Sequence, residues 1–211
     1  MSAHPLRSPN PATLALADEE GNGHGPGSDL DALKAWLVTS VMFDPSQDDE
    51  TLIATFLEAY YSPKVAPFIR LYMDTMHGSI ADTEYYMREN FDEHAAFLTP
   101  LAVLTAAEAL THARTLTAPG SRYRARVDVA KLAIYYPMLL RWEEMAAFAK
   151  SETLPWPLLE TTKDQALQWF LGFGGQLDPP LTHLNEPGTH NLSWFAAEVG
   201  RGGAPARGGR D

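Results

Sequence analysis

The chain has 211 residues, 45% of them hydrophobic, so it is long enough for one ordinary domain with its own core. Its formal net charge of −11 argues against nucleic acid or an anionic membrane as a partner, because phosphates bind clustered Lys and Arg. The absence of cysteine excludes disulfides, thiolate metal sites and a cysteine nucleophile, but does not select a cellular compartment.

The two ends of the chain differ in composition from its middle. Residues 1–27 and 200–211 are rich in Gly, Pro and Ala, which predicts disorder. The first residues lack the apolar centre of a secretory signal peptide, and no stretch approaches the roughly 20 apolar residues of a membrane helix. We therefore expect a soluble protein with one folded domain over residues 28–199.

Helical periodicity begins at Ser28 and continues through three consecutive segments. Ser28 followed by Asp31 has the form of a capping box, and apolar residues then recur every three or four positions as far as Pro45. A second helix is expected from Ser46, with three carboxylates in its first turn, near the positive helix end. It ends at Pro63, where a third helix is expected to begin.

Proline marks the breaks in the second half of the folded region. Thr99 before Pro100 predicts the start of a helix that runs to about Thr117. The longest periodic segment spans residues 121–150. Pro137 lies inside it and should kink or split that helix, because proline lacks a backbone N–H and its ring crowds the preceding turn.

One more short helix is predicted towards the C-terminus. Thr161 or Thr162 caps it, and the glycine-rich run Gly172–Gly175 is expected to end it. Irregular chain and one last helical turn at SWFAAEV should follow. Since no strand pattern of real length appears, the sequence predicts an all-α fold, an irregular bundle of five to seven helices with disordered termini.

The order of residues in the first three helices is similar to that of a known bacterial family. The stretches that carry the similarity are Met42-Phe43-Asp44-Pro45, Phe56-Leu57, Tyr60-Tyr61-Ser62 and Pro67-Phe68-Ile69. This progression resembles the C-terminal helical region of a domain of unknown function numbered 4838, in which Trp often stands at the position of Phe43 and Gly at that of Ser62. The resemblance extends over roughly residues 25–195 and is densest at its start.

The resemblance implies an architecture more than an activity. Proteins of that family resemble glycoside hydrolases with a TIM barrel, and α-glucuronidases have a similar arrangement. Their catalytic carboxylates would lie on barrel strands that precede this region, and the 27 residues before Ser28 offer no counterpart. We therefore expect this chain alone to have no catalytic residue, cofactor or metal site. It would be either a stand-alone derivative of the family or the product of a truncated gene model. Without a barrel beneath it, the first helix should expose an apolar stripe.

Clusters of titratable residues are better explained by structure than by chemistry. Asp48-Asp49-Glu50 suits a helix end better than a catalytic carboxylate pair, and Glu143-Glu144 suits an exposed polar face. Asp92-Glu93-His94 lacks the ligand spacing of a zinc site. The run Gly21–Gly27 lacks the pattern of a phosphate loop, and the tail from Arg201 to Arg210 has too few arginines to bind RNA.

Aromatic residues are the remaining candidates for ligand contact. Most of them fall at helical core spacing and are expected to pack inside. Trp156 and Tyr86 are the pair we single out for stacking on the apolar face of a sugar.

Three hypotheses of function follow from the sequence. The first is a non-catalytic accessory domain that braces a glycoside-hydrolase-like barrel or forms a wall of a carbohydrate cleft. The second is an independent protein-interaction module that uses the apolar faces of the first and third helices, including for self-association. The third is a small carboxylate-based enzyme. None of them names a substrate or an oligomeric state.

Overall fold

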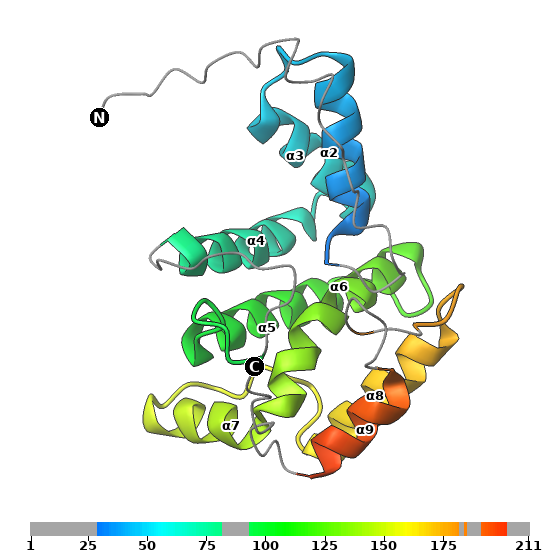
Figure 1. The fold of residues 1–211 in the computed structure, drawn as a ribbon. Helices are drawn as coiled ribbons and strands as arrows, with labels where there is room; N and C mark the ends of the chain where they lie inside the picture. The colour runs from blue at the N-terminus through cyan, green and yellow to red at the C-terminus, as the bar shows by residue number, and fades with distance from the viewer. Residues whose placement is uncertain (1–28, 82–92, 182–183, 185–190, 202–211) are drawn as a thin grey trace, which may run out of the picture.

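The computed structural model describes residues 29–81, 93–181, 184 and 191–201. Within these residues it contains eight α-helices and no strand (Figure 1). The helices are α2 (Asp31–Phe43), α3 (Asp49–Tyr61), α4 (Ala66–Ala81), α5 (Pro100–Thr115), α6 (Arg122–Leu140), α7 (Trp142–Ser151), α8 (Lys163–Gln176) and α9 (Leu192–Gly200). The predicted all-α fold is confirmed, with slightly more helices than the five to seven expected. The chain ends for which we predicted disorder lie almost entirely outside the described residues.

The start of α2 differs from its prediction. The helix begins at Asp31, and the residue before it, Leu30, has a left-handed φ of 50° and provides no side-chain cap. The carboxylate of Asp29 accepts a hydrogen bond of 2.6 Å from the hydroxyl of Tyr72 in α4. A hydrogen bond to α4 therefore fixes the chain just before α2, in place of the predicted capping box.

The cap of α3 is Asp48, where Ser46 was predicted. Asp48 accepts hydrogen bonds from the backbone N–H of Thr51 at 2.9 Å and from its hydroxyl at 2.6 Å. The hydroxyl of Ser46 instead donates to Asp44 Oδ1 at 2.7 Å and closes the turn between α2 and α3. The remaining two carboxylates of the acidic run do occupy the first turn of α3, where they favour the positive helix end.

The junction of α3 and α4 is a strained turn, where the third helix was expected to begin directly at Pro63. Ser62 has φ 86° and ψ 153°, a region of backbone conformation that is essentially restricted to glycine. Residues 63–65 form a turn, and α4 begins at Ala66. Glycine would adopt this backbone conformation without the clash that a Cβ atom causes.

The longest periodic segment is divided into two helices, but not at Pro137, where the prediction placed the kink or break. Helix α6 continues past the proline to Leu140, and α7 begins at Trp142. Arg141 between them has φ −110° and ψ 29°, although its N–H still bonds the carbonyl of Pro137 at 3.0 Å. The break therefore comes one turn after the proline.

The glycine-rich run lies inside α8, where we expected it to end the helix. Thr162 caps α8 as predicted, and the helix continues through Gly172–Gly175. A Cβ atom on the buried Gly174 would lie 3.3 Å from Leu181 Cδ2, so the missing side chain lets the chain after α8 fold back against it. Close packing explains this glycine better than helix termination. The last predicted turn is also longer than expected, since α9 is a helix of nine residues.

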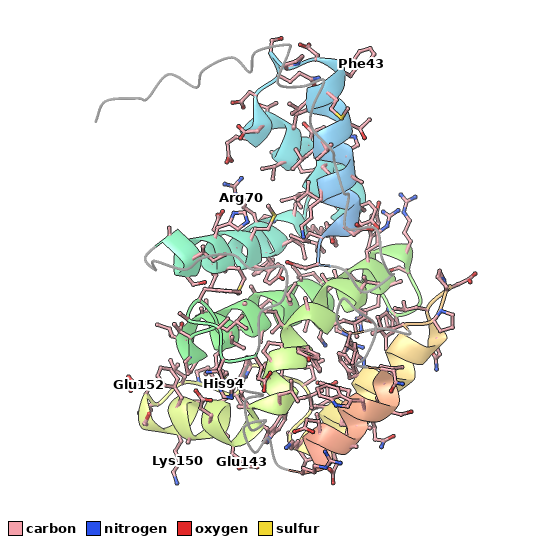
Figure 2. The ribbon with its side chains drawn as sticks, viewed as in Figure 1. Phe43, Arg70, His94, Glu143, Lys150 and Glu152 are labelled. Atoms are coloured by element: carbon pink, nitrogen blue, oxygen red, sulfur yellow. The ribbon has the colours of Figure 1, made fainter. Side chains whose placement is uncertain are left out.

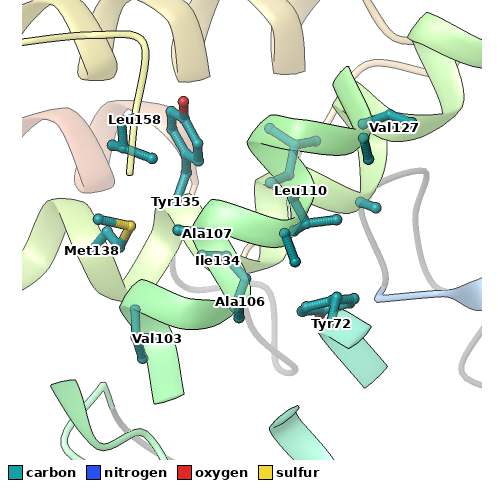
Figure 3. Close-up of a cluster of buried hydrophobic side chains, with 14 of the residues drawn as sticks. Tyr72, Val103, Ala106, Ala107, Leu110, Val127, Ile134, Tyr135, Met138 and Leu158 are labelled. Atoms are coloured by element: carbon teal, nitrogen blue, oxygen red, sulfur yellow. The ribbon is translucent and has the colours of Figure 1, made fainter. Parts of the chain in front are cut away.

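Helices α5 and α6 form the centre of the core. Helix α4 packs along α5, α7 also packs on α5, and α6 carries α8 and α9. Figure 3 shows buried side chains of this centre, among them Leu110 of α5 and Ile134 and Met138 of α6. Fully burying a side chain of this kind contributes roughly 1.5–3 kcal/mol. Helices α2 and α3 form a hairpin that projects from this body (Figure 1) and contacts it through α3.

Candidate functional site

The free end of α2 carries exposed apolar side chains. Val38 is 37% exposed, Met42 57% and Phe43 91%, and Phe43 points away from the molecule at the end of the hairpin (Figure 2). Val38 and Met42 are four residues apart and so share one helix face. Within α2, which the structure describes completely, Leu33 is the one buried residue. We call Val38, Met42 and Phe43 the α2 tip. This exposed patch covers only the second half of the helix, and is shorter than the apolar stripe expected of it.

A column of rings within the hairpin is joined to the body by Arg126. Trp36 of α2 lies 5.6 Å from Phe56 of α3, and Phe56 stacks on Tyr60 at 4.9 Å, measured between ring centroids. The guanidinium of Arg126 in α6 lies 3.8 Å from the centroid of Tyr60, and its Nη1 donates to the carbonyl oxygen of Tyr60 at 2.6 Å. A cation over an aromatic face is attractive, so this column joins α2, α3 and α6.

A cleft of about 450 Å³ lies at the base of the hairpin, where α2, α3, α6 and α8 meet. Its volume is in the range of small-ligand sites, and most of its lining is apolar or aromatic. Its polar lining residues, other than the tyrosines, are Asp31, Arg126, Gln176 and Asp178. They offer both donors and acceptors to a ligand.

The carboxylates of the cleft do not have the surroundings of a glycosidase acid. Such an acid needs a pKa raised by burial, whereas Asp31 is half-buried and Asp178 is exposed. Burial does raise the pKa of Asp29, but Asp29 is hydrogen-bonded to Tyr72 and does not line the cleft. The cleft is therefore better suited to holding a polar ligand than to acid–base chemistry.

Trp156, one of the two predicted sugar contacts, is half-buried against the α6–α7 junction. Its ring lies 4.7 Å from that of Trp142, edge to face, and its Nε1 donates to the carbonyl oxygen of Glu160 at 3.0 Å. These contacts give Trp156 a structural role and leave part of its surface accessible. Tyr86 lies outside the described residues, so the pairing of the two aromatic residues stays a prediction.

The acidic clusters noted in the sequence take part in local ion pairs and caps. Glu50 accepts from Arg70 on the surface. Of the pair Glu143-Glu144, Glu144 is bonded to Arg141, and this hydrogen bond lowers the pKa of Glu144. In the described part of the chain, no three His, Asp or Glu side chains come together as a metal site would require. Nor does any helix there combine the length and the apolar character that crossing a membrane demands.

Sequence reasoning missed that Lys131 is buried. It lies between Val127 and Ile134 on the predicted apolar face of α6, and it is 1% exposed. A charged residue at a core position of a helical pattern was the available signal. Its partners come from α6 and α8, and the periodicity of α6 alone does not identify those on α8.

The family model described as Domain of unknown function (DUF4838) matches residues 10–74. The matched segment belongs to this family. The DUF4838 segment includes all of α2 and α3 and the first part of α4, so it holds the α2 tip and the strained Ser62. The similarity that we expected beyond residue 74 is not part of the match. No curated protein and no solved structure matches the chain.

Proposed function

We propose that this chain is a non-catalytic helical accessory domain that docks on a glycoside-hydrolase-like barrel through the α2 tip. The exposure of Val38, Met42 and Phe43 inside the DUF4838 segment is the observation that carries the proposal. Burying a fully exposed Phe contributes roughly 1.5–3 kcal/mol, so Phe43 alone accounts for at least a tenfold effect on affinity. In the resembled family, the barrel precedes this helix and would cover it.

The position of the tip also supports docking. It lies at the far end of a projecting hairpin, so a large partner can reach it without meeting the body of the domain (Figure 1). The aromatic column holds the base of the hairpin through Tyr60 and Arg126. The cleft and the accessible part of Trp156 are where such a domain would add contacts to a carbohydrate.

Calorimetric titration with a barrel from a full-length family member, cut at the position equivalent to Ser28, tests the docking. We expect the wild-type chain to bind and Phe43→Ser to bind at least tenfold more weakly. Leu101→Ser is the matched control, because Leu101 is 54% exposed on α5 and lies outside the DUF4838 segment. Unchanged affinity of Phe43→Ser, or no binding by the wild-type chain, would refute the docking surface.

A panel of chromogenic glycosides tests the non-catalytic part of the proposal. The purified chain should give no turnover with any of them. If turnover occurs and is abolished by Asp31→Asn or Asp178→Asn, the cleft is an active site and the proposal is wrong.

The alternative is an interaction module that associates with a second copy of itself. Leu71 of α4 is 47% exposed, so the third predicted helix also presents an apolar side chain to a partner. Light scattering over a range of concentrations separates the two functions. A dimer that Phe43→Ser or Leu71→Ser dissociates favours self-association, whereas a monomer at every concentration excludes it.

A further inference from the structure

A lysine amine is buried between α6 and α8 without a hydrogen-bond partner. Lys131 is 1% exposed, and among the described residues no acceptor bonds its Nζ. The Nζ atom lies 4.6 Å from the ring centroid of Tyr135, one turn further along α6, and 4.3 Å from that of Trp169 in α8. Ring faces attract an ammonium, but they do not replace the hydrogen bonds with water that burial removes.

The charged groups around Lys131 are mostly engaged with other partners. They are Glu160 in the segment before α8, Arg114 of α5, and Asp128 and Arg124 of α6. Asp128 pairs with Arg114 at 2.6 Å, and Glu160 accepts a hydrogen bond of 2.5 Å from the hydroxyl of Tyr135. The two carboxylates attract the ammonium from a distance, and the two arginines repel it.

Desolvation dominates this balance. Burial lowers the pKa of Lys131 from 10.5 to about 8, and the attraction of Glu160 only partly opposes it. The protonated amine is therefore less stable in the closed site than in water. It follows that protonation favours any opening that admits water to Lys131, and that loss of the proton favours the closed arrangement.

Helix α8 is the element that covers the amine. Its Trp169 lies over Lys131, and α8 packs on α6 and also carries α9. The ring of Trp169 stacks on Phe173 with a centroid distance of 5.4 Å and an interplanar angle of 5°. Because Phe173 lines the cleft at the base of the hairpin, a shift of Trp169 changes one wall of that cleft.

We propose that α8, together with α9, is a proton-controlled cover over Lys131 and over one side of the cleft. Proton uptake by Lys131 loosens α8 from α6, because the opening admits the water that the buried ammonium lacks. Proton loss closes α8 again. This device is independent of docking through the α2 tip.

Hydrogen exchange of the intact chain at pH 7 and pH 9, read by mass spectrometry, tests the cover. Protection factors correct for the intrinsic pH dependence of exchange. With pKa values of about 8 closed and 10.5 open, linkage predicts that α8 amides gain roughly tenfold in protection over this interval. Lys131→Met and Lys131→Arg should lack the gain, because neither side chain releases a proton there. Lys150→Met, at an exposed position on α7 (Figure 2), should keep it.

Equal protection of the α8 amides at both pH values in the wild type overturns the proposal, and so does a gain in protection that persists in Lys131→Met. The proposal is also wrong if the α8 amides exchange only by global unfolding, together with those of α5. A ¹⁵N titration of the Lys131 amine in the wild-type chain provides a test that needs no variant. A midpoint near pH 8 supports the cover, and a midpoint near 10.5 refutes it.

Discussion

Replacing Arg141 by methionine should strongly destabilise the domain. The side chain of Arg141 is 6% exposed and lies at the break between α6 and α7. Its Nη1 donates to the carbonyl oxygens of Glu93 at 2.9 Å and Leu98 at 2.6 Å. Its Nε and Nη2 donate to the two carboxylate oxygens of Glu144 at 2.9 and 2.6 Å. One guanidinium thus holds the segment before α5 against the start of α7.

The two halves of this arrangement differ in energy. Charge-assisted hydrogen bonds contribute about 1.5–3 kcal/mol each; the bond to Leu98 is buried and that to Glu93 is partly buried, and Arg141→Met leaves both carbonyls without this donor. The pair with Glu144 contributes only about 0–1 kcal/mol, because the Glu144 side chain is 46% exposed and water screens it. We therefore expect Arg141→Met to lower the free energy of unfolding by about 3–5 kcal/mol, a large part of a typical domain's stability.

Urea unfolding at pH 7, followed by circular dichroism, measures this loss. Glu144→Gln is the matched control, since it weakens the ion pair but keeps the bonds to Glu93 and Leu98, and it should cost no more than about 1 kcal/mol. A loss below about 1 kcal/mol for Arg141→Met, or equal losses for both variants, would show that the buried carbonyl bonds do not stabilise the fold.

Two further predictions concern backbone strain and pH. Ser62→Gly should raise the free energy of unfolding by about 1 kcal/mol, because glycine removes the strain at φ 86° at a smaller entropic cost. Ser62→Ala should give no such gain in the same urea assay, and equal effects of both changes would exclude strain as the cause. Asp29→Asn should become more stable relative to the wild type as the pH rises from 4 towards 7. Burial raises the folded-state pKa of Asp29 above 3.8, so the folded wild type binds more protons than the unfolded chain and loses stability through that window. A difference between the two proteins that does not vary with pH would contradict this assignment.

Local signals in the sequence correctly predicted helix caps, because a cap acts within its own helix. Thr99 with Pro100 and Thr162 cap the helices for which they were predicted, because a side-chain cap needs only its own first turn. The segment that contains Pro137 does break, but one turn after the proline, so this local signal did not give the position of the break. Ser46 and Asp48 are both possible caps and stand close together. The sequence did not show that Ser46 bonds within the turn and that Asp48 caps the helix.

Features that depend on distant partners could not be derived from spacing. Gly174 is explained by Leu181, which returns to α8 only after the chain has turned. Lys131 is buried against Trp169 of another helix, and the periodicity of α6 cannot predict that contact. An exposed apolar stripe on the first helix was expected only because of the family resemblance, and nothing in the sequence indicated that Val38, Met42 and Phe43 would be its exposed residues.

The cation and ring contact between Arg126 and Tyr60 has a consequence for any partner of this protein. Because it ties the base of a projecting hairpin to the longest helix of the core, the hairpin is preorganised before an encounter. A partner then recovers more of the energy of burying Phe43 as affinity, since little conformational freedom is left to lose on association.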